Sequence, residues 1–107
     1  MTELKKASAC KSKDEVRRQI DLIDQELIRL FAKRYEYVQS IVKFKDKTEE
    51  AIIDAERKEK VIKERSKWAA DFGLDKKAYA QLFRHLIDHN ISKEMEIFEK
   101  SKEINIG

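Results

Sequence analysis

Four polar side chains stand where apolar helical patterns ask for core residues, and they are the candidates for chemistry. Arg34 and Lys45 continue an apolar stripe in the first half of the chain, and Asn90 and Glu94 interrupt another stripe near its end. Arg binds a carboxylate through two parallel hydrogen bonds, whereas Lys offers a compact charge. The pattern indicates one shared polar pocket, suited to a small dianion.

The positive charges of Arg34 and Lys45, if they face inward, can be accommodated in three ways. Their side chains can reach solvent, pair with a carboxylate in the core, or wait for an anionic ligand. On one continuous helix Arg34 and Lys45 share a face and lie about 16 Å apart, so their long side chains could hold the two ends of a dianion. Arg17, about 25 Å from Arg34, could join only the site of a partner chain whose first helix runs antiparallel.

Other kinds of site are poorly supported. His85 and His89 have the spacing of two metal ligands on a helix, but no third ligand is evident. The sequence contains no Gly-rich phosphate loop, no Cys-x-x-Cys pair and no nucleophilic Ser motif. We therefore expect neither a metal nor an organic cofactor, and any catalysis should rest on shape and electrostatics.

Composition narrows the class of protein. The chain has 107 residues, 42% of them charged, with 2 Gly and no Pro, which favours an all-α fold. The 24 basic and 21 acidic residues are mixed along the chain, so nucleic acid is not an expected partner. The single Cys10 and the lack of a long apolar run predict a cytoplasmic protein without a membrane segment.

Three helices are expected to position the candidate residues. The first runs from Ser12, which opens a capping box with Glu15, to about Lys47. Thr48–Ile53 has no helical periodicity and is predicted to be a connection.

The second helix begins after Asp54 and stops at Gly73, and the third begins after Asp75. Trp68 is expected in the core. Residues 1–11 are predicted to be a disordered tail, and residues 12–107 a single domain.

Length argues for an oligomer. A first helix of about 35 residues would extend roughly 53 Å, whereas a compact domain of this size has a radius of gyration of about 13 Å. Its apolar stripe runs along nearly the whole helix, and a second copy of the chain is the simplest cover for it.

Short motifs in a fixed order mark the region from about residue 14 to 99. They are Val16-Arg17-x-x-Ile20-Asp21-x-Ile23-Asp24, then Arg34, Lys45 and Glu56-Arg57. In these the chain resembles the all-helical chorismate mutase family. Further segments are most similar to one branch of it, the isochorismate-pyruvate lyases: Tyr37-Val38, Lys43-Phe44-Lys45, Glu64-Arg65-Ser66-Lys67-Trp68-Ala69 and Gly73-Leu74-Asp75.

The resemblance implies an intertwined homodimer of three-helix chains with two equivalent sites. It implies that Arg17 enters the partner's site to bind a substrate carboxylate, and that Arg34 binds a carboxylate within its own chain. Lys45 would contact the ether oxygen and a carboxylate.

Glu56 would match a residue that contacts the ring hydroxyl. Asn90 would line the site, and Glu94 would stand where most relatives carry a Gln that donates to the ether oxygen.

Two departures from the mutase pattern bear on the choice of branch. Ala55 replaces an Arg, and Ile52 falls near the place of an expected acidic residue, which favours the lyase branch. Glu94 replaces the Gln, and only a protonated carboxyl can donate to an ether oxygen.

The resemblance therefore implies a pericyclic enzyme that acts on a chorismate-type dicarboxylate. It is most like an isochorismate-pyruvate lyase, which forms salicylate and pyruvate. The alternatives are a chorismate mutase proper, which forms prephenate, and a non-catalytic module for helical dimerisation or metabolite binding. In that last case a Glu94–Lys45 ion pair would be merely structural.

Overall fold

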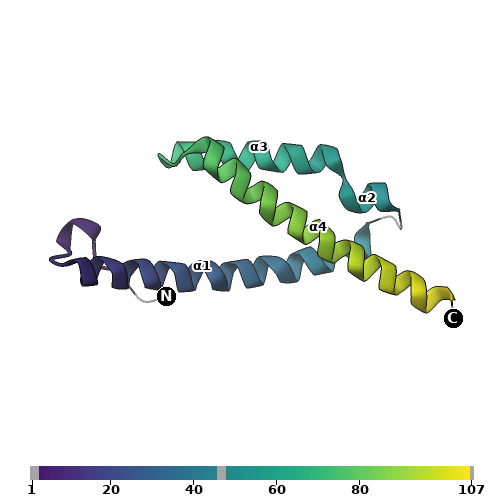
Figure 1. Ribbon diagram of the computed structural model, residues 1–107, viewed down its shortest axis with the longest axis horizontal. Helices are drawn as coiled ribbons and strands as arrows, with labels where there is room; N and C mark the ends of the chain where they lie inside the picture. The colour runs from purple at the N-terminus through teal and green to yellow at the C-terminus, as the bar shows by residue number, and fades with distance from the viewer. Residues whose placement is uncertain (1–2, 46–47, 107) are drawn as a thin grey trace. The chain divides into compact units, whose positions relative to one another are not determined.

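The computed structural model describes residues 3–45 and 48–106, and every regular element in those residues is helical. Three long helices, α1 (Lys13–Ile41), α3 (Ala55–Asp71) and α4 (Lys76–Ile106), confirm the expected all-α architecture. Between α1 and α3 lie a 3₁₀ turn, η2 (Val42–Phe44), and a one-turn helix, α2 (Glu49–Ile53) (Figure 1). None of the helices described is long and apolar enough to cross a membrane.

The chain divides into two compact units, Met1–Tyr37 and Val38–Gly107, and each is described by itself. In the first unit, the start of α1 is fixed by its predicted cap. The Ser12 hydroxyl accepts the Glu15 N–H at 3.1 Å, as a capping box requires. The Glu15 carboxylate accepts the N–H of Lys11 at 2.6 Å rather than that of Ser12.

Residues 3–11 contain a 3₁₀ turn, η1 (Ala7–Ala9), and make contacts with α1. The Lys5 backbone N–H donates to the Gln19 side chain at 2.9 Å, and the Lys5 ammonium pairs with Glu15 at 3.2 Å. The hydrogen bond from Lys11 and the ion pair with Lys5 lower the pKa of the Glu15 carboxyl. The division into a disordered tail of residues 1–11 and one domain of residues 12–107 stays a prediction.

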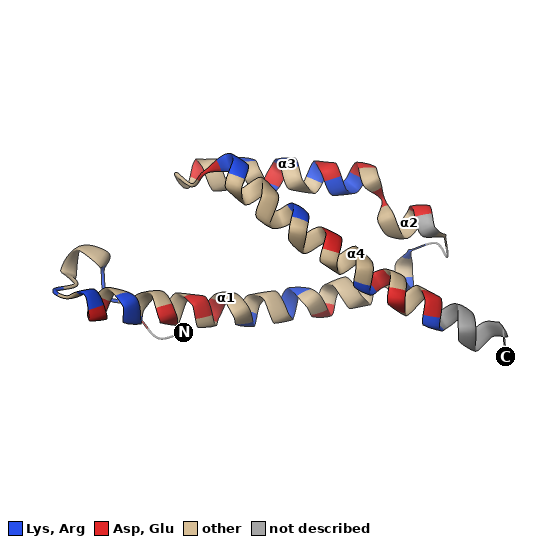
Figure 2. Ribbon diagram, in the orientation of Figure 1, with Lys and Arg blue, Asp and Glu red and all other residues tan. Residues whose placement is uncertain are grey.

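The apolar stripe of α1 is largely open in the single chain. Within this fully described helix no residue is buried. Five of its large apolar side chains lie at the predicted helical spacing and are between 41% and 49% exposed: Val16, Ile20, Ile23, Leu27 and Leu30. Figure 2 shows basic and acidic residues mixed along α1 and α3.

The first helix ends earlier than predicted. The α-helix stops at Ile41, and the chain tightens into η2, where Val42 is buried and η2 contacts α4. Two adjacent β-branched residues, Ile41 and Val42, weaken helix propensity, and burial of Val42 then favours the tighter turn. The prediction of a helix reaching about Lys47 is wrong, and residues 46–47 lie outside the described residues.

Thr48–Ile53 was predicted to be a connection, and this too is wrong, because α2 occupies most of it. The Thr48 hydroxyl accepts the Ala51 N–H at 3.1 Å as its N-cap. Asp54 ends α2 in the left-handed region (φ 39°, ψ 68°) and also caps α3, because its carboxylate accepts the Arg57 N–H at 3.1 Å. The predicted role of Asp54 is therefore confirmed.

The helices α3 and α4 form an antiparallel hairpin (Figure 1). At its turn the Gly73 N–H donates to Ala70 and the Leu74 N–H to Ala69, both at 2.9 Å, with Gly73 at φ +78°. This is a Schellman motif, and it confirms Gly73 as the helix stop. Asp75 accepts the Lys77 N–H at 2.9 Å, so its predicted cap of the third helix is confirmed as well.

Aliphatic side chains and one phenylalanine make the apolar core of the second unit. The buried apolar residues come from η2, α2, α3 and α4: Val42, Ile52, Val61, Ile62, Ala69 and Phe98. Trp68 does not join them. It is 52% exposed, with the Arg65 guanidinium 4.5 Å from its ring centroid, so its predicted place in the core is wrong for the single chain.

Candidate active site

An ion pair between a lysine and a glutamate links the segment that follows η2 to α4, both in the second unit. The Lys45 ammonium lies 2.9 Å from the Glu94 carboxylate, although 49 residues separate the two in the chain. The Glu94 side chain is 5% exposed and that of Lys45 22%. Lys45, which was predicted to face inward, therefore pairs with Glu94, which was predicted to interrupt the apolar stripe of α4.

A second acceptor holds the same ammonium. Lys45 donates to the backbone carbonyl of Ile52 at 3.1 Å, and Ile52 is itself 2% exposed. Two acceptors thus take two of the three ammonium N–H groups within the described residues. One N–H direction and the partly exposed face of Lys45 are left for a ligand.

Asn90 adds a neutral polar group to the same helix face. It lies one turn before Glu94 on α4, and both residues are buried, as is Phe98 one turn after Glu94. Among the described residues no fully buried side-chain nitrogen or oxygen lacks a hydrogen-bond partner. The face of α4 therefore carries a buried polar patch, defined by Asn90 and Glu94, and Glu94 is the member of the patch that pairs with Lys45.

Arg17 and Arg34 belong to the first unit. Both lie on α1, where Arg17 is exposed, one turn after the helix start, and Arg34 is partly buried. Lys45 does not continue their helix, because η2 intervenes and Lys45 has an extended backbone (φ −85°, ψ 145°). The prediction that Arg34 and Lys45 share one face of a continuous helix is wrong, since that helix ends at Ile41.

Glu56 lies in the first turn of α3, as predicted, and is exposed in the single chain. Its carboxylate is favourably placed near the positive end of the helix dipole.

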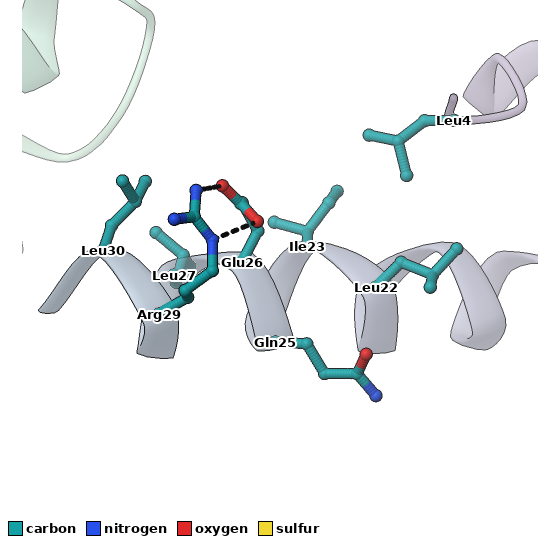
Figure 3. A pocket seen from close by; sticks show the side chains of 8 residues that line it. All are labelled: Leu4, Leu22, Ile23, Gln25, Glu26, Leu27, Arg29 and Leu30. Atoms are coloured by element: carbon teal, nitrogen blue, oxygen red, sulfur yellow. Dashed lines mark hydrogen bonds and ion pairs between the residues drawn. The ribbon is translucent and has the colours of Figure 1, made fainter. Parts of the chain in front are cut away.

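An apolar groove lies on α1 in the first unit, lined by eight residues (Figure 3). Ile23, Leu27 and Leu30 project to the side on which Leu4 lies, whereas Gln25 points away. The groove has a volume of about 490 Å³. The Arg29 guanidinium hydrogen bonds lower the pKa of the neighbouring Glu26 carboxyl at its edge.

Two contributors to these sites were not predicted from the sequence. The Ile52 carbonyl is a backbone group, so no side-chain pattern identifies it. Its helix could have been found, because Thr48 followed by Glu49 and Glu50 is the signature of an N-cap with an acidic first turn. Leu4 of the groove lies in a polar segment that carries no periodic signal.

Comparison with known proteins identifies the family. A family model described as chorismate mutase type II matches residues 16–95. The chain belongs to this family. The match spans all six candidate residues, all of α2 and α3, and parts of α1 and α4.

Two curated relatives are similar along most of their length. The isochorismate pyruvate lyase of Pseudomonas aeruginosa is 28% identical over 99 residues, which cover 92% of this chain and 97% of the relative. The chorismate mutase of Methanocaldococcus jannaschii is 25% identical over 91 residues, which cover 85% of this chain and 92% of the relative. The chain is therefore a chorismate mutase-family enzyme, with relatives named for two different reactions.

Proposed function

We propose that this chain catalyses a pericyclic reaction of a chorismate-type dicarboxylate, acting foremost as an isochorismate-pyruvate lyase. The observation that carries the proposal is the Lys45–Glu94 pair, a cation and a carboxylate brought together inside a chain of this family. Reactions of this kind need a folded substrate and charge stabilisation at the breaking C–O bond. Lys45 retains an N–H group for that purpose.

The proposed roles of the other residues are those that the family resemblance implies, and the chemistry of the side chains suits them. Arg34 binds one carboxylate of the substrate through a bidentate contact, and Arg17 binds another in the site of the partner subunit of a homodimer. Asn90 and Glu56 bind polar groups of the ring. Glu94 accepts the Lys45 ammonium and so positions it at the ether oxygen.

The lyase reaction is internally balanced. The C–O bond of isochorismate breaks as a ring hydrogen moves to the enolpyruvyl carbon, which yields salicylate and pyruvate. No external acid, base, metal or organic cofactor enters this step. The chain's own part is to hold the enolpyruvyl arm over the ring and to stabilise negative charge on the ether oxygen.

Two features support the lyase over the mutase. Ile52 is buried and apolar, and Ala55 carries no charge, so neither position supplies the polar groups that the resemblance implies for a mutase. The lyase relative is also similar over 97% of its own length. Chorismate mutase activity remains the second candidate, supported by the mutase relative.

The test is to supply isochorismate and chorismate separately and to identify the products. Salicylate with pyruvate supports the lyase, and prephenate supports the mutase. Lys45→Ala is the control variant and should strongly reduce the rate at which either product forms, while leaving a measurable residual rate. Substrate binding without turnover, seen as a rise in melting temperature, would favour the non-catalytic alternative.

A mixture of two strongly impaired variants tests the shared site. In a dimer of Arg17→Ala with Lys45→Ala, one of the two proposed sites keeps both side chains. Random exchange of subunits at equal amounts should then restore about a quarter of the wild-type rate. Half of the dimers are mixed, and each mixed dimer has one intact site out of two. Absence of recovery would show that Arg17 does not act in trans.

A further inference from the structure

The one-turn helix α2 is too short to be stable by itself. It has five residues, Glu49–Ile53, whereas isolated helices shorter than about 12 residues are marginal in water. Its order must therefore come from its caps and from its packing on α4. Buried Ile52 provides the apolar contact, since it is 2% exposed.

Both ends of α2 are fixed by specific residues. At the start, the Thr48 hydroxyl accepts the Ala51 N–H at 3.1 Å, and the Thr48 carbonyl accepts the Ile52 N–H at 3.2 Å. At the end, the Asp54 N–H donates to the Glu50 carbonyl at 2.8 Å from a left-handed backbone. These bonds define where the remaining backbone groups of α2 point.

The Ile52 carbonyl is among the last four of the helix, which have no partner within an α-helix. It accepts the Lys45 ammonium at 3.1 Å, part-buried. A cation at a helix C-terminus is also favoured by the helix dipole. Lys45 therefore caps α2, and α2 in turn holds Lys45.

We propose that α2 is the element that orients Lys45, and that Thr48 is a positioning residue acting through it. Glu94 alone would leave the ammonium free to rotate about a single contact. With acceptors on both Glu94 and Ile52, two N–H directions are fixed, and tetrahedral geometry then fixes the third. The catalytic meaning of this arrangement rests on the proposed function, whereas the mutual capping of Lys45 and α2 does not.

Hydrogen exchange tests the capping without any need for turnover. Lys45→Met should speed exchange of the Ile52 and Asp54 amides at least fivefold beyond the acceleration that its loss of global stability gives to core amides of α3. Lys93→Met is the matched control, because Lys93 pairs with Glu96 on the surface of α4 and should leave α2 unchanged. Equal acceleration in α2 and α3 would reflect global unfolding and would overturn the proposal.

Kinetics test the positioning role of Thr48. Loss of an N-cap of ordinary strength shifts a local folding equilibrium about fivefold, so Thr48→Val should lower kcat by up to about fivefold while KM stays within about twofold. Thr48→Ser keeps the hydroxyl and should restore the rate. Asp75→Ala removes the N-cap of α4 and should lower stability comparably with kcat unchanged.

A double-variant cycle separates a positioning effect from a loss of stability. If Thr48 acts through Lys45, Thr48→Val should have no further effect in a Lys45→Ala background. Independent losses in the two backgrounds would overturn the proposal. If the wild type turns over neither substrate, the proposed function fails, and the exchange measurement alone decides whether α2 and Lys45 stabilise each other.

Discussion

Removing either partner of the Lys45–Glu94 pair should not cost the same stability. Lys45→Met leaves the Glu94 carboxylate charged at a position that is 5% exposed. Breaking a fully buried ion pair in this way costs about 3–5 kcal/mol. Because the Lys45 side chain is 22% exposed, some water reaches the site, and we expect a loss of about 3 kcal/mol at the low end of that range.

Glu94→Gln is the milder change. The amide oxygen can still accept from Lys45, and the ammonium keeps both its solvent access and the Ile52 carbonyl. Exchange of a charged acceptor for a neutral one should cost about 1 kcal/mol. The expected ratio between the two losses is therefore about three.

Urea unfolding at pH 7 and one fixed protein concentration measures both losses. With an m value of about 1.5 kcal/mol/M, the midpoint should fall by about 2 M for Lys45→Met and by about 0.7 M for Glu94→Gln. The reasoning fails if the two midpoints move equally or in the reverse order. Either result would mean that the Glu94 carboxylate is not left buried when Lys45 is removed.

Three further outcomes are expected. Gly73→Ala should cost about 1 kcal/mol in thermal unfolding, because the new methyl meets no atom within 4 Å but the backbone stays at φ +78°; no loss would refute that strain. Ile23→Asp, at a position 42% exposed, should convert the proposed dimer to monomer in analytical ultracentrifugation; an unchanged mass would exclude this stripe as the interface. The hydrogen bond from Arg84 lowers the pKa of Glu59 below 4.5. The Glu59–Arg84 pair therefore contributes to the free energy of unfolding above that pH, and the contribution is lost on acidification. Glu59→Gln should reduce the fall in the free energy of unfolding at acidic pH.

The helix caps were predictable because they are local. Ser12, Asp54 and Asp75 each bond to an N–H two or three residues ahead, and Gly73 alone can adopt its positive φ without strain. Such features depend on a few consecutive residues, and a sequence pattern contains all of them. The three long helices follow from these caps and from the apolar periodicity between them.

The errors arose where tertiary contacts override local preference. No Gly or Pro stops α1 at Ile41. The β-branched Ile41 and Val42 only weaken the helix, and burial of Val42 beside α4 decides where it ends. The short α2 has only five residues, which is little more than one helical turn, so no apolar periodicity can be recognised in its sequence. Trp68 has a large aromatic side chain of the kind expected in a core. In the single chain, however, the Arg65 guanidinium lies over its ring, and about half of the Trp68 surface stays exposed.

The candidate site was predictable in composition but not in geometry. The misfit of Glu94 with an apolar stripe correctly marked it as an inward-facing group, whereas Lys45 lies beyond the end of the α1 stripe and reaches Glu94 from the segment after η2. Which carboxylate Lys45 meets depends on how η2 and α2 pack on α4, and no local sequence pattern specifies that packing. The Ile52 carbonyl could not be anticipated, because it is a backbone acceptor and no side-chain pattern marks it.

The pairing of Lys45 with a carboxylate also limits what this lysine can contribute to binding. An ammonium already neutralised by Glu94 has less charge to offer to an incoming dianion, and the free energy of binding should come mainly from the arginines. Its remaining N–H group is a placed donor, and such a donor is most useful where charge develops in the transition state. We therefore expect Lys45→Ala to act on kcat far more than on KM, and Arg34→Ala to act on both. If Lys45→Ala instead raises KM with kcat unchanged, then Lys45 binds the substrate in its ground state. Pairing with Glu94 would then not reserve the Lys45 ammonium for the C–O bond that breaks.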